Sequence, residues 1–459
     1  MKKLLVLGLL LNLSLIKVEA QTYKPKWESL DKRETPTWWT DAKFGIFIHW
    51  GPYSVPAYAP VNEVEGVYEK YAEHYENRLL QKNKLFTDHH NRYFGENFTY
   101  QDFAPQFKAE YFNPDAWADL FQKAGAKYVV LTSKHHDGFS LWPSAFSPRW
   151  NSVAIGAHRD LAGDLTEAVR KKGLRMGFYY SLLEWNHPLY KTATINQWVE
   201  EHMLPQMKEL VMAYKPEVIF SDGEWDYASN QFKSEKFLAW LYNESPVKQT
   251  VVVNDRWGKE TRSKHGDYYT TEYDLVGDKL GFGDKATHPW EESRGIGTSY
   301  GYNRFETTDH YFTSKQLIDL LIDKVSNGGN LLLNIGPKAD GLIPVIMQER
   351  LLDMGAWLKV NGAAIYGTTA WDKRPKNRKD QTVYYTVKGN DLYVICTKWP
   401  ENSIAVPGIS QAGKVNMLGT NKEVKYDLKN NTLTITAPEL NPATIPCNHA
   451  WVFRVANFK

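Results

Sequence analysis

The chain has 459 residues, which is long enough for one barrel-sized domain followed by a smaller one. Its formal net charge is only +2, and its basic residues are scattered, which argues against a nucleic-acid or an anionic-membrane partner. Only two cysteines occur, Cys396 and Cys447, so the chain is not a disulfide scaffold, and the sequence leaves open whether the two pair.

The first twenty residues have the pattern of a cleavable signal peptide. Lys2 and Lys3 precede an apolar run from Leu4 to Ile16, and a small-x-small sequence ends at Ala20. The run is too short to span a bilayer, and no later stretch approaches the length of about twenty apolar residues that a span needs. We therefore predict a secreted or periplasmic protein that is cleaved after Ala20 and has no membrane span.

Between about residues 40 and 360, strand-like apolar runs alternate with amphipathic helices. The predicted strands are Phe44–His49, Tyr128–Thr132, Arg175–Tyr180, Glu217–Ser221, Thr250–Asn254, Tyr268–Glu272, Thr298–Tyr302 and Asn330–Ile335. Eightfold alternation of this kind predicts a (β/α)8 barrel, here over residues 21–365. A doubly wound open sheet is the alternative, but no G-x-G-x-x-G motif follows any of the runs.

Two stretches depart from this alternation. The segment from Gly51 to Phe107 fits neither a helical nor a strand period, and we predict an elaborate loop over the mouth of the barrel. Beyond about Tyr366, short runs separated by Gly, Asn and Pro predict an antiparallel β-sandwich of five to eight strands over residues 366–459. The strand candidates there are Gln381–Val387, Asp391–Thr397, Lys414–Leu418, Thr432–Thr436 and Ala450–Val455.

Polar or ionisable side chains stand at the ends of seven consecutive predicted strands. The ends of barrel strands are where such folds carry their chemistry. In strand order these side chains are His49, the pair His135 and His136, Tyr179, Asp222, Arg256, Glu272 and Tyr300. We therefore expect them to meet in one cavity.

A pair of carboxylates is the first candidate for chemistry. Asp222 directly follows a buried strand, so its backbone is held rigidly, as a nucleophile requires; the alternative is a turn role before Gly223. A second carboxyl group would serve as the acid. Glu224, Glu272, Glu291 and Glu292 are the nearby choices, and periodicity alone does not rank them.

The histidines raise the question of a metal. No His-x-His or His-x-x-x-His pair occurs at these strand ends, and adjacent imidazoles such as His135 and His136 rarely reach one ion in good geometry. Neutral imidazole both donates and accepts hydrogen bonds, so we expect these side chains to bind the hydroxyls of a sugar, with no metal. A core histidine satisfied by the backbone is the alternative for His49.

In these same residues the chain resembles the α-L-fucosidases of glycoside hydrolase family twenty-nine, over essentially its whole mature length. The matching segments, in order, are Phe44–Pro56, Lys134–Phe139, Asn254–Gly258, Arg294–Gly297 and Ser299–Asn303. The resemblance implies that Asp222 is the nucleophile and that Glu272 is the general acid/base, with Glu291 in reserve. It further implies sugar-binding roles for His49, Glu73, His74, His135, His136, Tyr179 and Arg256.

Two positions depart from the family, which often has Trp where this chain has His74 and Phe220. Phe220 keeps an aromatic wall at its position, and with Tyr300 it is a candidate to meet the C6 methyl group of L-fucose. The aromatic content suits a sugar site and a large core equally well.

The resemblance implies a retaining α-L-fucosidase that acts by double displacement on fucosylated oligosaccharides or glycoconjugates, without a cofactor. The sequence does not address the oligomeric state. The alternatives are a sugar-binding module without catalysis and a different hexosidase. For His135 and His136 to line one pocket, the second strand has to stop by about Ser133, with Gly138 permitting a turn.

Overall fold

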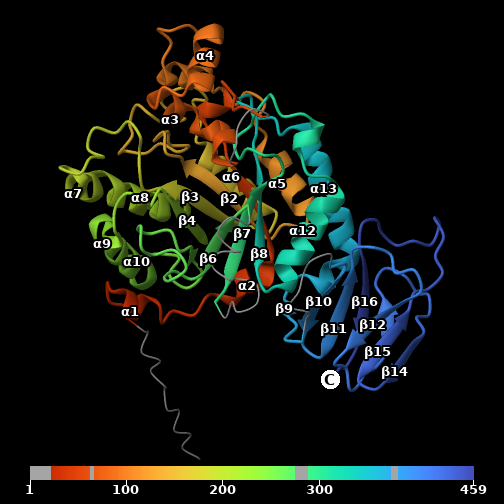
Figure 1. Cartoon of the computed structure of the whole chain (residues 1–459). Coiled ribbons are helices and arrows are strands. Elements are labelled where there is room, and N and C mark those ends of the chain that lie inside the picture. Colours follow the sequence, from red (N-terminus) through yellow and green to blue (C-terminus); the bar gives the residue numbers. More distant parts are fainter. Residues whose placement is uncertain (1–21, 62–66, 274–287, 374–380) are drawn as a thin grey trace, which may run out of the picture.

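The computed structural model describes residues 22–61, 67–273, 288–373 and 381–459 (Figure 1). The predicted signal peptide therefore lies outside the described residues. Within them, no helix is long and apolar enough to cross a membrane.

A barrel of parallel strands occupies the N-terminal three quarters of the chain. Its strands are β1 (Phe44–Ile48), β2 (Tyr128–Lys134), β3 (Arg175–Ser181), β4 (Val218–Asp222), β5 (Val252–Val253), β6 (Tyr269–Glu272), β7 (Trp290–Gly295) and β8 (Asn330–Ile335). They are hydrogen-bonded in the order β5-β4-β3-β2-β1-β8-β7-β6, with every neighbouring pair parallel. The backbone amides of Asp267 and Tyr268 donate to the carbonyl of Val253, which closes the barrel between β5 and β6. The predicted barrel is confirmed.

Helices surround the barrel and precede most of its strands (Figure 1). They are α1 (Trp27–Leu30), α2 (Thr37–Ala42), α3 (Tyr75–Leu80), α4 (Lys84–Tyr93), α5 (Pro114–Lys123), α6 (Leu161–Lys171), α7 (Ile195–Gln197), α8 (Leu204–Tyr214), α9 (Ser229–Phe232), α10 (Ser234–Asn243), α12 (Ser314–Ser326) and α13 (Val345–Asn361). The Asn113 side chain caps α5, and α5 and α6 are followed by Gly125 and Gly173 at positive φ, where a residue without a Cβ turns the chain most easily into β2 and β3.

The seventh strand is not where the sequence predicts it. It runs over Trp290–Gly295, whereas the predicted stretch Thr298–Tyr302 is a loop. The apolar strand pattern fails here because Glu291 and Glu292 are both fully buried within β7. Each has a hydroxyl donor, Tyr128 of β2 for Glu291 and Thr271 of the neighbouring β6 for Glu292, and such partners offset the cost of burying a carboxyl group.

The segment between β1 and α5 is more regular than the predicted loop. Its described residues contain α3 and α4 and the 3-10 segments Pro52–Ser54, Val67–Lys70, Ala72–His74 and Tyr100–Gln106. Figure 1 shows α3 and α4 projecting together from the barrel. Glu73 and His74 come from this segment and enter the cavity at the barrel mouth, so its predicted position over the mouth is confirmed.

The C-terminal part is a sandwich of two antiparallel sheets. Its strands are β9 (Thr369–Ala370), β10 (Val383–Lys388), β11 (Asp391–Cys396), β12 (Ser403–Pro407), β13 (Val415–Met417), β14 (Tyr426–Lys429), β15 (Thr432–Thr436) and β16 (Trp451–Val455). The sheets have the orders β13-β16-β11-β10-β9 and β12-β15-β14, and they enclose one hydrophobic core. Trp357 of α13 donates to the carbonyl of Ala450, which ties the sandwich to the barrel. Cys396 and Cys447 are free thiols.

Candidate active site

A cavity of about 590 Å³ opens at the carboxyl ends of the barrel strands. Its floor is aromatic, with Phe47, Tyr179, Phe220 and Tyr300 packed together inside the barrel. Because side chains alternate along a strand, Phe47 and His49 face the same side, as do Phe220 and Asp222. The strand geometry therefore carries ionisable groups to the wall above an apolar floor.

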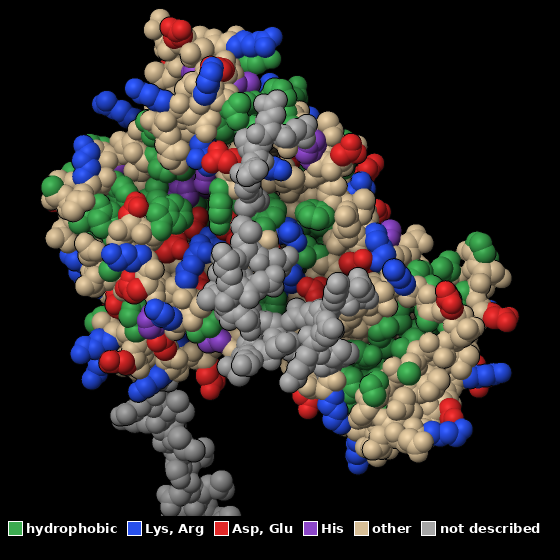
Figure 2. Space-filling view, in the orientation of Figure 1, with side chains coloured by type: hydrophobic (Ala, Val, Ile, Leu, Met, Phe, Trp, Pro, Cys, Tyr) green, Lys and Arg blue, Asp and Glu red, His purple; other side chains and the backbone are tan. Residues whose placement is uncertain are grey.

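Every residue first assigned a catalytic or sugar-contacting role from the sequence lines this cavity, whereas the reserve candidate Glu291 does not. They are His49, Glu73, His74, His135, His136, Tyr179, Asp222, Arg256, Glu272 and Tyr300. Figure 2 shows histidine, acidic and basic side chains gathered together on this face of the barrel. These residues therefore meet in one cavity as expected, although Tyr300 lies in a loop and not at the end of a strand.

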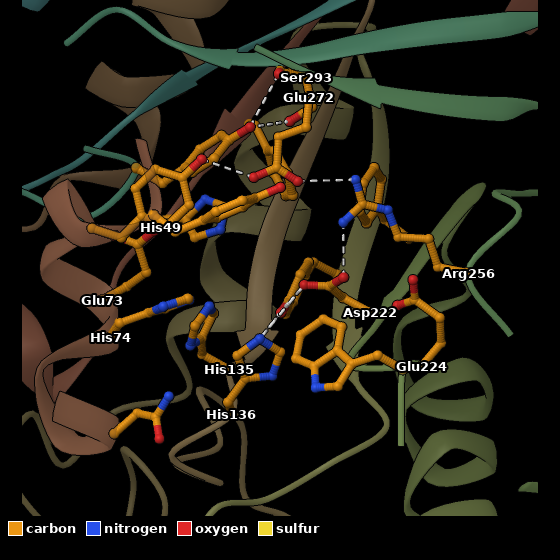
Figure 3. Close-up of a pocket in the computed structure, with 18 of the residues that line it drawn as sticks. His49, Glu73, His74, His135, His136, Asp222, Glu224, Arg256, Glu272 and Ser293 are labelled. Carbon is orange, nitrogen blue, oxygen red and sulfur yellow. Dashed lines mark hydrogen bonds and ion pairs between the residues drawn. The ribbon is translucent and has the colours of Figure 1, made fainter. Parts of the chain in front are cut away.

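Asp222, the last residue of β4, accepts hydrogen bonds on both oxygens (Figure 3). Arg256 Nη1 lies 2.8 Å from Oδ1, and the Tyr179 hydroxyl donates to Oδ2 over 2.9 Å. Burial alone would raise the pKa of the Asp222 carboxyl, but the charge of Arg256, with a contribution from His136, outweighs it and holds that pKa well below its usual range. Asp222 is therefore an ionised, oriented carboxylate at neutral pH.

Glu272, the last residue of β6, faces Asp222 from the other side of the cavity (Figure 3). Its Oε1 accepts from the Tyr71 hydroxyl over 2.9 Å, and its Oε2 accepts from Arg256 Nη2 over 3.2 Å. Tyr71 lies two residues before Glu73 and was not identified from the sequence. The only sequence signal for it is its place in the segment that also supplies Glu73 and His74.

One guanidinium connects the two carboxylates. Arg256 donates from Nη1 to Asp222 and from Nη2 to Glu272, while its Nε donates to Thr270 and its Cζ lies 5.0 Å from the centre of the Phe220 ring. A planar cation held at three nitrogens has little freedom to rotate. Arg256 therefore fixes the two carboxylates on opposite sides of one small volume.

His49 is held by a residue that was not identified from the sequence. Its Nδ1 lies 2.7 Å from Oδ1 of Asn334 in β8, and the Asn334 amide donates to the carbonyl of Tyr300. That bond makes Nδ1 the protonated nitrogen, so Nε2 is an acceptor. Burial lowers the pKa of His49 to about 3, which keeps the ring neutral. Asn334, which interrupts the apolar residues from Leu331 to Ile335 in β8, was the signal available.

His135 and His136 follow β2 directly, because the strand ends at Lys134 after a register shift between Thr132 and Lys134. Gly138 at φ +74° closes a turn onto the carbonyl of His135. Strand alternation no longer applies beyond that point, so both rings line the cavity, as predicted. Burial lowers the pKa of His135, and it lowers that of His136 to about 4.

Two further polar wall residues, Glu73 and His74, come from the segment after β1. Glu73 accepts hydrogen bonds from the Gly301 amide at 2.7 Å and from the Ser299 hydroxyl at 3.3 Å, and burial raises its pKa to about 8. His74 lies beside His135 and His136, and burial lowers its pKa to about 3. One ring nitrogen from each of His74, His135 and His136 lies within 4.8 Å of the other two. The positions of these residues in the sequence did not indicate so close an approach.

The other acidic candidates occupy different places. Glu224 lines the cavity, but its carboxylate is paired with Arg262 at 2.6 Å. Glu291 is fully buried, accepts from Tyr128 and is not among the cavity residues; burial raises its pKa to about 8. Glu292 points toward Thr271. Of the candidates, Glu272 is the one that shares Arg256 with Asp222.

Comparison with known proteins gives matches over both parts of the chain. A family model described as Alpha-L-fucosidase matches residues 11–363, and one described as Alpha-L-fucosidase C-terminal domain matches residues 376–456. The chain is 43% identical to tissue alpha-L-fucosidase of Homo sapiens, over 95% of this chain and 92% of that protein. It is 42% identical to plasma alpha-L-fucosidase of Rattus norvegicus, over 98% of this chain and 99% of the relative.

Solved structures match the fold of this chain over nearly its whole length. The Thermotoga maritima alpha-fucosidase in complex with a mechanism-based inhibitor is 39% identical, with a TM-score of 0.81 over 95% of this chain and 100% of that one. The same enzyme in complex with fucose gives a TM-score of 0.80 at 39% identity, with the same shares covered.

Proposed function

The chain belongs to the α-L-fucosidase family, and from this premise we propose that it releases terminal α-L-fucose by a double displacement in which Asp222 is the nucleophile and Glu272 the general acid/base. The observation that carries these roles is the bridge from Arg256 to both carboxylates. A pair of carboxyl groups that flank one small volume is what hydrolysis of a glycosidic bond requires.

In the first step, Asp222 attacks the anomeric carbon while Glu272 gives its proton to the departing oxygen. The glycosidic bond breaks, the aglycone leaves as an alcohol, and a covalent fucosyl–enzyme ester forms. Asp222 is suited to this role because the pKa of its carboxyl is held low and its position is fixed by β4.

In the second step, the Glu272 carboxylate takes a proton from a water molecule, and that water attacks the same anomeric carbon. The ester bond to Asp222 breaks, L-fucose leaves with its configuration retained, and Glu272 is again protonated. Retaining enzymes place the two carboxyl groups about 5–5.5 Å apart, against about 6.5–9.5 Å for inverting ones. A crystal structure with bound fucose would measure that separation directly.

The wall residues serve recognition in this proposal. His49, with Nδ1 bonded to Asn334, presents Nε2 as an acceptor for a sugar hydroxyl. Contacts from His49 and Arg256 to ring hydroxyls would tighten as charge develops in the transition state. Phe220 and Tyr300 form the apolar surface proposed to meet the C6 methyl group. No cofactor takes part in these steps.

The function is tested with a panel of aryl glycosides. The full chain should release the aryl alcohol from the α-L-fucoside and not from the other hexosides, and the sugar product should initially have the α configuration by NMR. Activity on another hexoside instead would establish the rival hexosidase function. Binding of fucose without turnover would establish a sugar-binding module.

The two adjacent histidines give a separate prediction. His135→Ala and His136→Ala should each lower kcat/KM by about 10–100-fold, because a buried polar group left unpaired costs roughly 1–3 kcal/mol. The free energy of unfolding should change less. His90→Ala is the matched control, since His90 is also buried but bonds to Tyr75 and Phe98 outside the cavity. A silent substitution at either member of the pair would contradict its sugar-binding role.

The metal prediction is also direct. Prolonged chelation followed by elemental analysis should give a metal-free protein with an undiminished rate, since both proposed steps use only carboxyl groups and water. Stoichiometric zinc together with loss of activity on chelation would contradict the hydroxyl-binding role of the histidines.

We further propose export, with cleavage after Ala20, a catalytic barrel over residues 21–365 and a C-terminal sandwich over residues 366–459. The lysine-flanked apolar run at the N-terminus supports the first proposal, and the separate hydrophobic core of the sandwich supports the second. N-terminal sequencing of the exported protein tests the cleavage site.

A further inference from the structure

We propose that His74, His135 and His136 form a binding site for a divalent transition-metal ion such as Zn²⁺, and that a metal bound there blocks the sugar cavity. The ion would be an inhibitor of the enzyme and not a cofactor. The inference goes beyond the proposed function, which uses no metal.

The three side chains come together from two distant parts of the chain. His135 and His136 follow β2, and His74 ends the 3-10 segment Ala72–His74 that crosses the barrel mouth. Their potential ligand atoms lie within 4.8 Å of one another, and Figure 3 shows the three rings side by side on one wall. Nitrogen ligands of a tetrahedral zinc lie about 3.3 Å apart, given Zn–N bonds of about 2.0–2.1 Å, so modest ring rotations would close the site.

His136 already has the orientation of a metal ligand. The Ser181 hydroxyl donates to the Leu183 carbonyl at 2.7 Å, so its oxygen is free to accept from His136 Nδ1 at 2.6 Å. That bond places the proton on Nδ1 and leaves the lone pair of Nε2 directed into the cavity. A histidine that binds a metal typically has its other nitrogen held by a partner in this way.

The other two rings have nitrogens to give. His135 is buried, and its Nδ1 has no hydrogen-bond partner in the described part of the chain. His74 makes only ring contacts with Tyr71, Trp185 and the two histidines among the described residues. An unpaired buried nitrogen costs free energy that a bound ion would recover.

Negative charge beside the cluster favours a cation. Asp222 Oδ2 lies 3.6 Å from His136 Nε2, and the Tyr179 hydroxyl donates its proton to Oδ2. The Nε2 lone pair of the neutral imidazole and the carboxylate oxygen therefore face each other with no proton between them. An ion at the cluster would lie next to Asp222 and would occupy space that the sugar needs. Inhibition should therefore be competitive with substrate.

A second cluster in the described part of the chain has similar spacing but a different electrostatic setting. Glu184, His187 and His202 also bring ligand atoms within 4.8 Å of one another. There the ammonium group of Lys134 lies 2.7 Å from Glu184, and both side chains are buried. Lys134 is paired directly with Glu184, one of the ligand groups of this cluster, and its charge would repel an ion bound there, whereas Arg256 beside the histidines is paired with Asp222 and Glu272. This cluster serves as the internal control.

Calorimetric titration of the chelator-treated, desalted full chain with ZnCl₂ tests the proposal without measuring activity. We expect one zinc ion per chain, and an apparent affinity that falls when L-fucose is present at saturation. His74→Trp, which installs the residue often found at this position in the family, and His135→Ala should each weaken zinc binding by at least about 10-fold. His187→Ala should leave it unchanged. Circular dichroism and thermal unfolding of each variant check that it is folded.

Two further readouts separate this proposal from the proposed function. X-ray absorption of the zinc-loaded chain should show three imidazole nitrogens in the first coordination shell. Zinc should raise KM for an aryl fucoside without lowering kcat, and chelation should reverse the effect. Absence of stoichiometric binding, or loss of binding in His187→Ala with retention in His74→Trp, would overturn the metal site while leaving the fucosidase mechanism intact.

Discussion

Replacing Asp222 with alanine should lower kcat on the order of 10⁴–10⁶-fold, the loss typical of removing the group that forms the covalent intermediate. The effect should fall on the chemical step, because Asp222 supplies the bond-forming oxygen from a rigid position at the end of β4. Removing the carboxylate leaves Arg256 with Glu272 as its remaining ionic partner in the described site. We therefore also expect the free energy of unfolding to fall, by less than the increase in the barrier to the chemical step.

Azide distinguishes a lost nucleophile from a damaged site. A small anion can occupy the space left by the Asp222 carboxylate and attack the anomeric carbon from the same side. We expect azide to restore turnover of an activated aryl fucoside and to yield a fucosyl azide of inverted configuration, identified by NMR. Asp267→Asn is the control, because that buried carboxyl group pairs with Arg33 outside the cavity and its loss should affect only stability. Near wild-type activity in Asp222→Ala would show that Asp222 is not the nucleophile.

Replacing Glu272 with alanine should give an effect that depends on the leaving group. Natural glycans and aryl fucosides with poor leaving groups should lose about 10²–10⁴-fold in rate, the usual contribution of general acid catalysis. Activated aryl fucosides need no proton on the departing oxygen, so their first step should be largely spared. Measuring kcat/KM across leaving groups of increasing pKa should give a much steeper dependence for the variant than for the wild type.

Glu291 supplies the matched comparison. Burial raises the pKa of its carboxyl to about 8, so Glu291 is largely neutral at neutral pH, and Glu291→Gln should mimic it with little effect on the leaving-group dependence. If Glu291→Gln reproduced the steep dependence and Glu272→Ala did not, the acid/base role would pass to Glu291 despite its position away from the cavity.

Much of this site could be predicted from the sequence because local chemistry and barrel geometry act together. Buried parallel strands have continuous apolar runs, and a polar residue at the end of such a run has to emerge at the mouth of the barrel. That reasoning identified His49, Asp222 and Arg256 as members of one cavity, which the structure confirms. The change in texture near Tyr366 likewise predicted the C-terminal sandwich.

Where the sequence reasoning failed, the deciding contacts are long-range. The strand β7 was misplaced because Glu291 and Glu292 are poor strand candidates unless Tyr128 and Thr271 lie beside them. Tyr128 is 163 residues from Glu291, and Thr271 is 21 residues from Glu292. The Tyr71 bond to Glu272 spans 201 residues and the Asn334 bond to His49 spans 285, so no local period signals either one.

The sequence by itself determined the kinds of side chain at the strand ends and the order in which they occur. Only the tertiary structure decided that Arg256 bridges Asp222 and Glu272, and that His74 lies beside His135 and His136. The physical reason is that a side chain's hydrogen bonds and charge depend on groups within a few ångströms in space. Closing the barrel brings such groups together from segments that share no sequence neighbourhood.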